Sequence, residues 1–174
     1  GYYPEAVINF LALLGWHATG DQEMYTMQEL IDQFSLERVS KSGAKFDYEK
    51  GKWFNHQYLQ LKSNEELAEQ FMPLLDTKLS TLNTKPSLET VSKVIGLTKD
   101  RVNFVSELWD QVNFFFVAPT EYDEKSLKKR WKEDSPKHMT EMLALLEAHD
   151  DWSAEGLDNL IMPWIAEKEY GVGI

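Results

Sequence analysis

Residues 63–75, Ser-Asn-Glu-Glu-Leu-Ala-Glu-Gln-Phe-Met-Pro-Leu-Leu, contain the pattern that decides the fold. Ser63 and Glu66 are spaced as a capping box, in which each side chain binds a main-chain N–H at a helix start. The apolar residues that follow the box recur at helical spacing: Leu67, Phe71, Leu74 and Leu75. The stretch therefore predicts an amphipathic helix, which Pro73 should kink.

Similar helix signals occur along the whole chain. Pro4 suits a first helical turn, and Thr26 with Glu29 forms a second capping box. Thr98 should cap a helix that runs toward Phe116. The predicted helical stretches cover residues 4–14, 26–34, 47–59, 63–75, 87–95, 98–116, 124–132, 137–148 and 153–169. No strand with an alternating pattern has a partner, so we expect an all-α chain.

The chain has two candidate boundaries. A basic, aromatic segment gives way to a new capping box near residues 62–64, which predicts a division into residues 1–62 and 63–174. A weaker break lies at residues 118–122, where Pro119 interrupts the helical pattern. The pieces are too short for independent cores, so we expect the helices to pack together as one rod or cage.

Composition excludes several classes of protein. Hydrophobic residues make up 43% of the chain and aromatic residues 13%, which is enough for a buried core. No cysteine is present, so disulfides and thiolate metal sites are excluded and a cytoplasmic location fits. The longest apolar run, Ala6–Trp16, is too short to span a bilayer, so no membrane contact is expected.

The formal net charge of −11 argues against nucleic acid as a partner, but the charge is unevenly distributed. Between the acidic ends lie two basic segments, residues 38–62 and residues 125–138, which we call the basic islands. Each has a net charge of +4. Such an island can bind a polyanion, and it can equally be a solvated face. The acidic ends leave a second reading open, namely a helical protein-protein interaction module with acidic docking surfaces.

Four segments near the start together resemble the glutamyl-tRNA synthetase family. They are Gly1–Trp16, Thr26–Ile31, Phe34–Ser40 and Phe46–Tyr58, in the family's order. The later part resembles the family's anticodon-binding region through Arg101-Val-x-x-x-x-Glu-Leu108 and through the segment from Trp152 to Lys168. The resemblance implies an elongated helical bundle or cage typical of a class I glutamyl-tRNA synthetase. Residues 1–62 would end the stem-contact region, and residues 63–174 would form an incomplete anticodon-binding region.

The resemblance also implies an activity that this chain does not carry by itself. Members attach glutamate to tRNA-Glu with ATP and Mg²⁺ in an N-terminal catalytic domain. The family's His-x-Gly-His and Lys-x-Ser-Lys motifs are absent here, and Val39–Gly43 lies on the wrong side of Gly1–Trp16 to be the second one. The chain is thus expected to be inactive alone, with no catalytic, cofactor or metal site. Its expected partners are tRNA-Glu and the N-terminal catalytic domain of the same enzyme.

Arg101 is the leading candidate for an anticodon contact. By its place in the motif it matches the family's arginine that contacts an anticodon base, with Lys99 beside it. If Thr98 caps a helix, both cations lie in the first turn, where the helix dipole disfavours positive charge. Contact with RNA would explain that placement. The alternative is that Arg101 merely pairs with Asp100 or another neighbouring acid.

The remaining candidates are phosphate contacts from the two islands. The candidates in the first island can be presented outward by a loop and a helix start: Arg38, Lys41, Lys45 and Lys52. The candidates in the second island share one helical face by their spacing: Lys125, Lys128, Lys129 and Lys132. Solvated charge is the alternative for both sets. Four aromatic residues could stack on bases, although their spacing favours the core: Trp53, Phe54, Tyr58 and Trp109.

Overall fold

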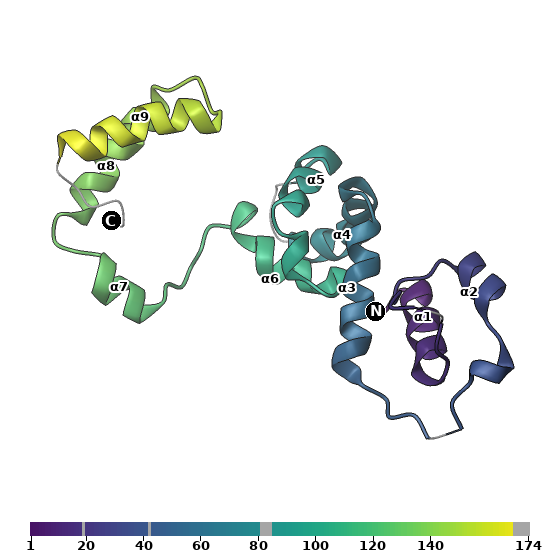
Figure 1. Cartoon of the computed structure of the whole chain (residues 1–174). Coiled ribbons are helices and arrows are strands. Elements are labelled where there is room, and N and C mark those ends of the chain that lie inside the picture. The colour runs from purple at the N-terminus through teal and green to yellow at the C-terminus, as the bar shows by residue number, and fades with distance from the viewer. Residues whose placement is uncertain (19, 42, 81–84, 169–174) are drawn as a thin grey trace. The chain divides into compact units, whose positions relative to one another are not determined.

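The computed structural model describes residues 1–18, 20–41, 43–80 and 85–168, and it divides the chain into two compact units, Gly1–Ala118 and Pro119–Ile174 (Figure 1). The first unit contains α1 (Pro4–Gly15), α2 (Met27–Gln33), η1 (Leu36–Arg38), α3 (Tyr48–Leu61), α4 (Asn64–Lys78), α5 (Leu88–Gly96), η2 (Lys99–Arg101), η3 (Val105–Glu107), α6 (Leu108–Val112) and η4 (Asn113–Phe115). The second contains α7 (Glu124–Arg130), α8 (Ser135–Glu147) and α9 (Ala154–Glu167).

The all-α prediction is confirmed. Among the described residues, β-structure is limited to one isolated antiparallel bridge between Trp16 and Val39. No helix in the described ranges is long and apolar enough to cross a membrane.

Local capping signals set the helix starts, as predicted. At the start of α4, the Ser63 N–H donates to Glu66 Oε2 at 2.7 Å, and the Glu66 N–H donates to Ser63 Oγ at 3.1 Å. Thr26 and Glu29 form the same reciprocal pair at the start of α2. Because the cap N–H stabilises the ionised form, the pKa of the Glu66 carboxyl lies below its usual value.

The main core of the first unit lies between α4 and α5. Its fully buried members include Leu67, Phe71 and Leu75 of the deciding stretch, together with Ile95 of α5 and Leu59 of α3. Leu59 connects α3 to this core across the junction at residues 62–64. The compact units instead divide after Ala118, where the second candidate boundary was expected. The functional division at residue 62 stays a prediction.

A smaller core joins α1 to α3. Phe10 of α1 packs against Phe54 of α3, and both are buried. Beside them the fully buried Asn9 donates to the Glu23 carbonyl at 2.9 Å and accepts from the Tyr25 N–H at 2.8 Å. α3 therefore contributes to both cores, through Phe54 here and through Leu59 in the main core.

The predicted helix over residues 98–116 is wrong. The chain forms short turns there, and α6 itself spans only Leu108–Val112. The Thr98 side chain does not cap a helix; its hydroxyl is buried and donates to the Val94 carbonyl at 3.4 Å. Val102 is extended and buried, and the Glu107 carboxylate binds the Asn103 N–H at 2.8 Å. Tertiary burial and this capping bond therefore outweigh local helical propensity.

Within the second unit, α7 and α8 meet at a short connection. α7 ends at Arg130 rather than at residue 132, because Trp131 is extended and the Lys132 N–H donates to Ser135 Oγ at 2.8 Å. α8 therefore starts at Ser135, two residues before the predicted start. Lys168 and Glu141 form an ion pair of 3.3 Å between α9 and α8.

Candidate nucleic-acid interface

Polar side chains of α3 hold the segment that carries Arg101. Gln60 Nε2 donates to the Lys99 carbonyl at 2.7 Å. One helical turn earlier, His56 Nδ1 lies 2.8 Å from the Val102 carbonyl, which can only accept, so Nδ1 is the donor. Asn55 Nδ2 donates to the Asn103 carbonyl. These bonds fasten residues 99–103 along α3, and they position the turn before any ligand arrives.

The Lys99 side chain is held against α3, and its predicted contact with the anticodon stays a prediction. Its Nζ donates to the carbonyls of Gln60, at 3.4 Å, and Lys62, at 3.2 Å. These carbonyls lie at the C-terminal end of α3, where helix carbonyls are unsatisfied and positive charge is favourable. The ammonium of Lys99 therefore lies against the end of α3.

Arg101 lies at the surface. Its side chain is 66% exposed, and its nearest acid is Asp100, with 4.0 Å between Nε and Oδ1. Only the single 3-10 turn η2 follows Thr98, and no α-helix begins there, so the dipole of a long helix that was expected to act on Arg101 is absent. Instead, the turn is fixed before Arg101 by the hydrogen bonds of Lys99 and after it by the burial of Val102. The guanidinium of Arg101 is left exposed to solvent. The pairing with Asp100 is long and exposed, and such pairs are weak.

Arg101 shares a shallow groove of about 300 Å³ with residues of α3. Lys52, Trp53 and His56 line one side, and Asp100, Arg101 and Asn103 line the other. The structure thus brings together two candidates, Lys52 and Arg101, that lie 49 positions apart in the sequence. Trp53 is 37% exposed, which leaves part of its ring available for contact.

The charges of this groove are balanced. Lys52 Nζ lies 2.8 Å from Glu49 Oε1, and this hydrogen bond raises the pKa of Lys52, which keeps the ammonium protonated. Glu49 and Asp100 together offset Lys52 and Arg101. A balanced set of donors and acceptors beside an aromatic ring suits the edge of a base better than phosphate alone.

The other lysine and arginine candidates lie outside the groove. Arg38 is in η1, whereas Lys41 and Lys45 are exposed in the loop before α3. In the second unit, Lys125, Lys128 and Lys129 are on α7. The prediction that Lys132 shares their helical face is wrong, because α7 ends before it. Lys132 Nζ instead donates to the Lys128 carbonyl at 3.0 Å.

The aromatic candidates separate into core and surface. Phe54 is fully buried, and the Tyr58 hydroxyl donates to the Tyr25 carbonyl at 2.6 Å. Trp109 packs partly against the main core. These three residues contribute to the core, as their spacing predicted, whereas Trp53 is 37% exposed. His56 was missed as a groove residue; its position four residues after Lys52 on a predicted helix was the available signal.

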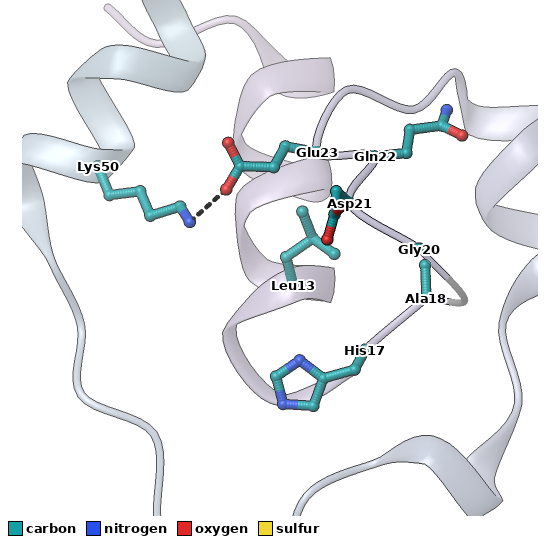
Figure 2. Close-up of a pocket in the computed structure, with 8 residues that line it drawn as sticks. All are labelled: Leu13, His17, Ala18, Gly20, Asp21, Gln22, Glu23 and Lys50. Atoms are coloured by element: carbon teal, nitrogen blue, oxygen red, sulfur yellow. Dashed lines mark hydrogen bonds and ion pairs between the residues drawn. The ribbon is translucent and has the colours of Figure 1, made fainter.

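A larger hollow of about 410 Å³ lies between α1, the loop after it and α3 (Figure 2). Asp21 and Glu23 supply negative charge to its wall, and the Lys50 ammonium is bound by Glu23 at 2.7 Å. His17 stands at the opposite end (Figure 2). Phosphate is repelled by such carboxylates. Within the described ranges, no group of three or more histidines and acids could hold a metal ion.

Two family models cover most of the chain. The anticodon binding domain matches residues 58–174, and the catalytic domain of class I tRNA synthetases (E and Q) matches residues 1–53. The two matched ranges adjoin within α3. Lys52 and Trp53 of the groove therefore lie in the range matched by the catalytic-domain model, and Arg101 lies in the range matched by the anticodon binding domain.

Curated relatives agree with these matches. The chain is 57% identical to a glutamate–tRNA ligase of Bacteroides thetaiotaomicron and 58% identical to one of Bacteroides fragilis, each over 99% of this chain. It spans about a third of their length (34%).

Experimental structures give the same result. The crystal structure of a glutamate tRNA ligase from Elizabethkingia meningosepticum, in complex with its amino acid, superposes with a TM-score of 0.85 at 40% identity. That match covers 99% of this chain and 34% of the other. The glutamate-tRNA synthetase from Elizabethkingia anophelis has a TM-score of 0.82 at 39% identity, with 99% and 33% covered.

Proposed function

Since the chain belongs to the glutamate–tRNA ligase family of class I aminoacyl-tRNA synthetases, we propose that it is the tRNA-binding portion of such an enzyme. The whole enzyme would use ATP and Mg²⁺ to attach glutamate to tRNA-Glu, in a catalytic domain whose family model residues 1–53 match and which would extend N-terminal to this portion. The bound chain would orient the tRNA toward that domain, which increases the rate by positioning. The setting would be the cytoplasm, where translation takes place.

The observation that carries this proposal is the exposed guanidinium of Arg101 on a turn fixed to α3. Fixing the turn in advance lowers the entropic cost of binding. The guanidinium can donate two parallel hydrogen bonds to a base edge, so Arg101 would contact an unpaired anticodon base. Lys52 would contact the neighbouring phosphate, and the exposed part of Trp53 would cover the base.

The two proposed regions would meet at this groove. Residues 1–62 would contact the inner stem of the tRNA, with Arg38, Lys41 and Lys45 on phosphates. Residues 63–174 would bind the anticodon arm, with phosphate contacts from Lys125, Lys128, Lys129 and Lys132. Lys99 would support Arg101 through α3 rather than meet the anticodon itself. The alternative of a helical protein-interaction module has no support from the relatives.

A binding titration against tRNA-Glu and an unrelated tRNA tests this function. We expect a preference for tRNA-Glu, and affinity that falls as salt rises because bound phosphates release counterions. Arg101→Ala should weaken tRNA-Glu binding by about 1–3 kcal/mol. Lys93→Ala is the matched control, because Lys93 is an exposed cation of the same unit that lies outside the groove and pairs with Glu89 at 2.7 Å.

Two results would overturn the proposal. One is a folded wild-type chain that binds both tRNAs equally at every salt concentration. The other is an Arg101→Ala variant that binds tRNA-Glu as well as the Lys93→Ala control, which would remove Arg101 from the interface. The same pair of variants in the intact enzyme should differ in kcat/KM for tRNA and agree in KM for ATP.

A further inference from the structure

The side chain of Asn55 joins the start of α1 to the segment that carries Arg101. Its Oδ1 accepts from the Tyr3 N–H at 2.7 Å, and its Nδ2 donates to the Asn103 carbonyl. Asn55 is fully buried, and its two partners lie 52 and 48 positions away from it in the sequence. Both ends of one buried amide are therefore used to hold distant segments together.

The two segments fall in different family matches. Tyr3 lies in the range matched by the catalytic-domain model, residues 1–53, and Asn103 lies in the range matched by the anticodon binding domain, residues 58–174. Asn55 is on α3 between these two ranges. Its amide is thus a polar bridge from the part that matches the catalytic domain to the turn that carries Arg101.

Further contacts hold the same end of α1. The ring of Tyr2 meets that of Phe104 edge to face, with 4.9 Å between centroids. The Tyr3 hydroxyl donates to Gln70 Oε1 at 2.8 Å, and the Lys62 ammonium lies 4.7 Å from the centroid of the Tyr3 ring. All three partners belong to the range matched by the anticodon binding domain. Residues 2 and 3 are therefore anchored to that part of the fold.

A buried amide with both hydrogen bonds made responds to movement at either end. If the turn at residues 99–103 shifts, the Asn55 amide must follow it or leave a polar group unpaired, which is costly away from water. If the amide follows, the Tyr3 N–H must move as well. Pro4, the next residue, is the first residue of α1. A displacement of the turn is therefore carried into the start of α1.

We propose that Asn55 is a positioning residue that couples the Arg101 groove to the catalytic domain. RNA bound at Arg101 fixes the turn at residues 99–103 in one position, and Asn55 transmits that position through Tyr3 to α1. Asn55 does not line the groove, so it acts through the turn and not by touching RNA. The inference rests on the proposed function and adds the residue through which binding affects the reaction.

Amide hydrogen exchange in the full chain tests this link without catalysis. Exchange of the Tyr3 N–H requires its bond to Asn55 to open. Saturating tRNA-Glu should slow this exchange by roughly 5- to 150-fold, the usual size of a coupling between two sites. Asn55→Asp keeps the oxygen that accepts from Tyr3 but loses the donor to the Asn103 carbonyl. This variant should bind tRNA-Glu without the slower exchange at Tyr3.

Aminoacylation kinetics of the intact enzyme give a second readout. Asn55→Asp should lower kcat for tRNA-Glu by roughly 10- to 100-fold, because a small misplacement far from the chemistry can cost about that much. KM for tRNA-Glu should change little, since Gln60 and His56 still hold the main chain of residues 99 and 102. Gln60→Leu should show the opposite split, with KM raised more than kcat is lowered.

Val91→Ala is the control for a loss of stability alone. Val91 is fully buried in the main core and does not line the groove. The variant should melt at a lower temperature and keep the wild-type kcat and the slower exchange at Tyr3. Phe104→Leu removes only the ring contact with Tyr2, so it should fold where Asn55→Asp does not. It should lower kcat in the same direction by a smaller factor.

The inference is overturned if folded Asn55→Asp keeps the wild-type kcat, or if Val91→Ala lowers kcat as much. It is also overturned if Asn55→Asp retains the slower exchange at Tyr3, because the RNA would then cover Tyr3 directly. If Asn55→Asp does not fold, an unchanged kcat in Phe104→Leu overturns it. Failure of the proposed function has a different signature, since binding itself then lacks a preference for tRNA-Glu. Failure of this inference leaves that preference intact and removes only its effect on Tyr3 and kcat.

Discussion

Gln60 and Lys99 bind each other's main chains. Gln60 Nε2 donates to the Lys99 carbonyl at 2.7 Å, and Lys99 Nζ donates to the Gln60 carbonyl at 3.4 Å. The pair joins the end of α3 to the turn at residues 99–101, whose exposed side chains are those of Asp100 and Arg101. The position of Arg101 therefore depends on two side chains 39 positions apart in the sequence.

Lys99→Met should lower stability and should weaken RNA binding less than Arg101→Ala does, because it loosens the turn that positions Arg101 without removing the guanidinium. The substitution keeps most of the apolar stem but removes the charge from the carbonyls at the end of α3, at a cost of about 0.3–1 kcal/mol. Urea unfolding measures the first effect, and titration with tRNA-Glu measures the second, with Arg101→Ala as the comparison. If Lys99→Met weakens tRNA binding as much as Arg101→Ala does while stability stays the same, Lys99 contacts the RNA directly.

Gln60→Leu should weaken both stability and tRNA binding. The change leaves the Lys99 carbonyl without its hydrogen bond, a loss of about 1–3 kcal/mol, and it loosens the turn that positions Arg101. Gln57→Leu is the control, since Gln57 is on the same helix and its side chain makes no hydrogen bond among the described residues. Equal affinities for the two variants would mean that the turn stays in place without Gln60.

Asn9→Leu should be the most destabilising of these changes. Asn9 is fully buried, its Oδ1 accepts from the Tyr25 N–H at 2.8 Å, and its Nδ2 donates to the Glu23 carbonyl at 2.9 Å. Replacement leaves the Tyr25 N–H and the Glu23 carbonyl without this partner, at about 1–3 kcal/mol for each group that water cannot reach. Chemical denaturation should show the loss. Asn113→Leu, which removes only one long bond of 3.5 Å to the Asp110 carbonyl, should change stability far less.

Stability should fall as the solution is acidified below the usual carboxyl range. In both capping boxes a main-chain N–H donates to the glutamate, at Thr26 for Glu29 and at Ser63 for Glu66, and this lowers the pKa of each carboxyl from 4.5. A lowered folded-state pKa adds stability that is fully present above pH 4.5 and is lost as the pH falls through the lowered value.

The double variant Glu29→Gln/Glu66→Gln tests this pH dependence. Glutamine keeps the hydrogen-bonding geometry of a capping box but does not titrate. The variant should therefore show a smaller loss of thermal stability between pH 5 and roughly pH 3 than the wild type. Some loss should remain, because the pKa values of Asp123 and Asp151 are also lowered by hydrogen bonds at helix starts. Parallel melting curves for the two chains would contradict the assignment.

The sequence was most informative where structure is local. Capping boxes at Thr26 and Ser63 bind atoms within three residues, so their signatures predicted the starts of α2 and α4 correctly. The family could be identified for the same reason, because its motifs are short and keep their order. The buried face of α4 also followed from spacing alone, since helix geometry repeats every 3.6 residues.

Lys99 and Arg101 show what sequence could not separate. Both are cations in one short turn after Thr98, and local rules placed them together at the start of a helix that does not form. Only the tertiary structure shows that Lys99 binds the carbonyls at the end of α3, whereas Arg101 is exposed beside Lys52 and Trp53.

The physical reason is that these contacts join distant parts of the chain. Sequence by itself determined the family, the helical architecture and most helix starts, because their causes lie within a few residues. The groove depends on hydrogen bonds from Asn55, His56 and Gln60 to carbonyls about 40–50 positions away. Those bonds need α3 and the turn at residues 99–103 side by side, as only the packed fold places them, and they stabilise a turn that local propensity would have made a helix.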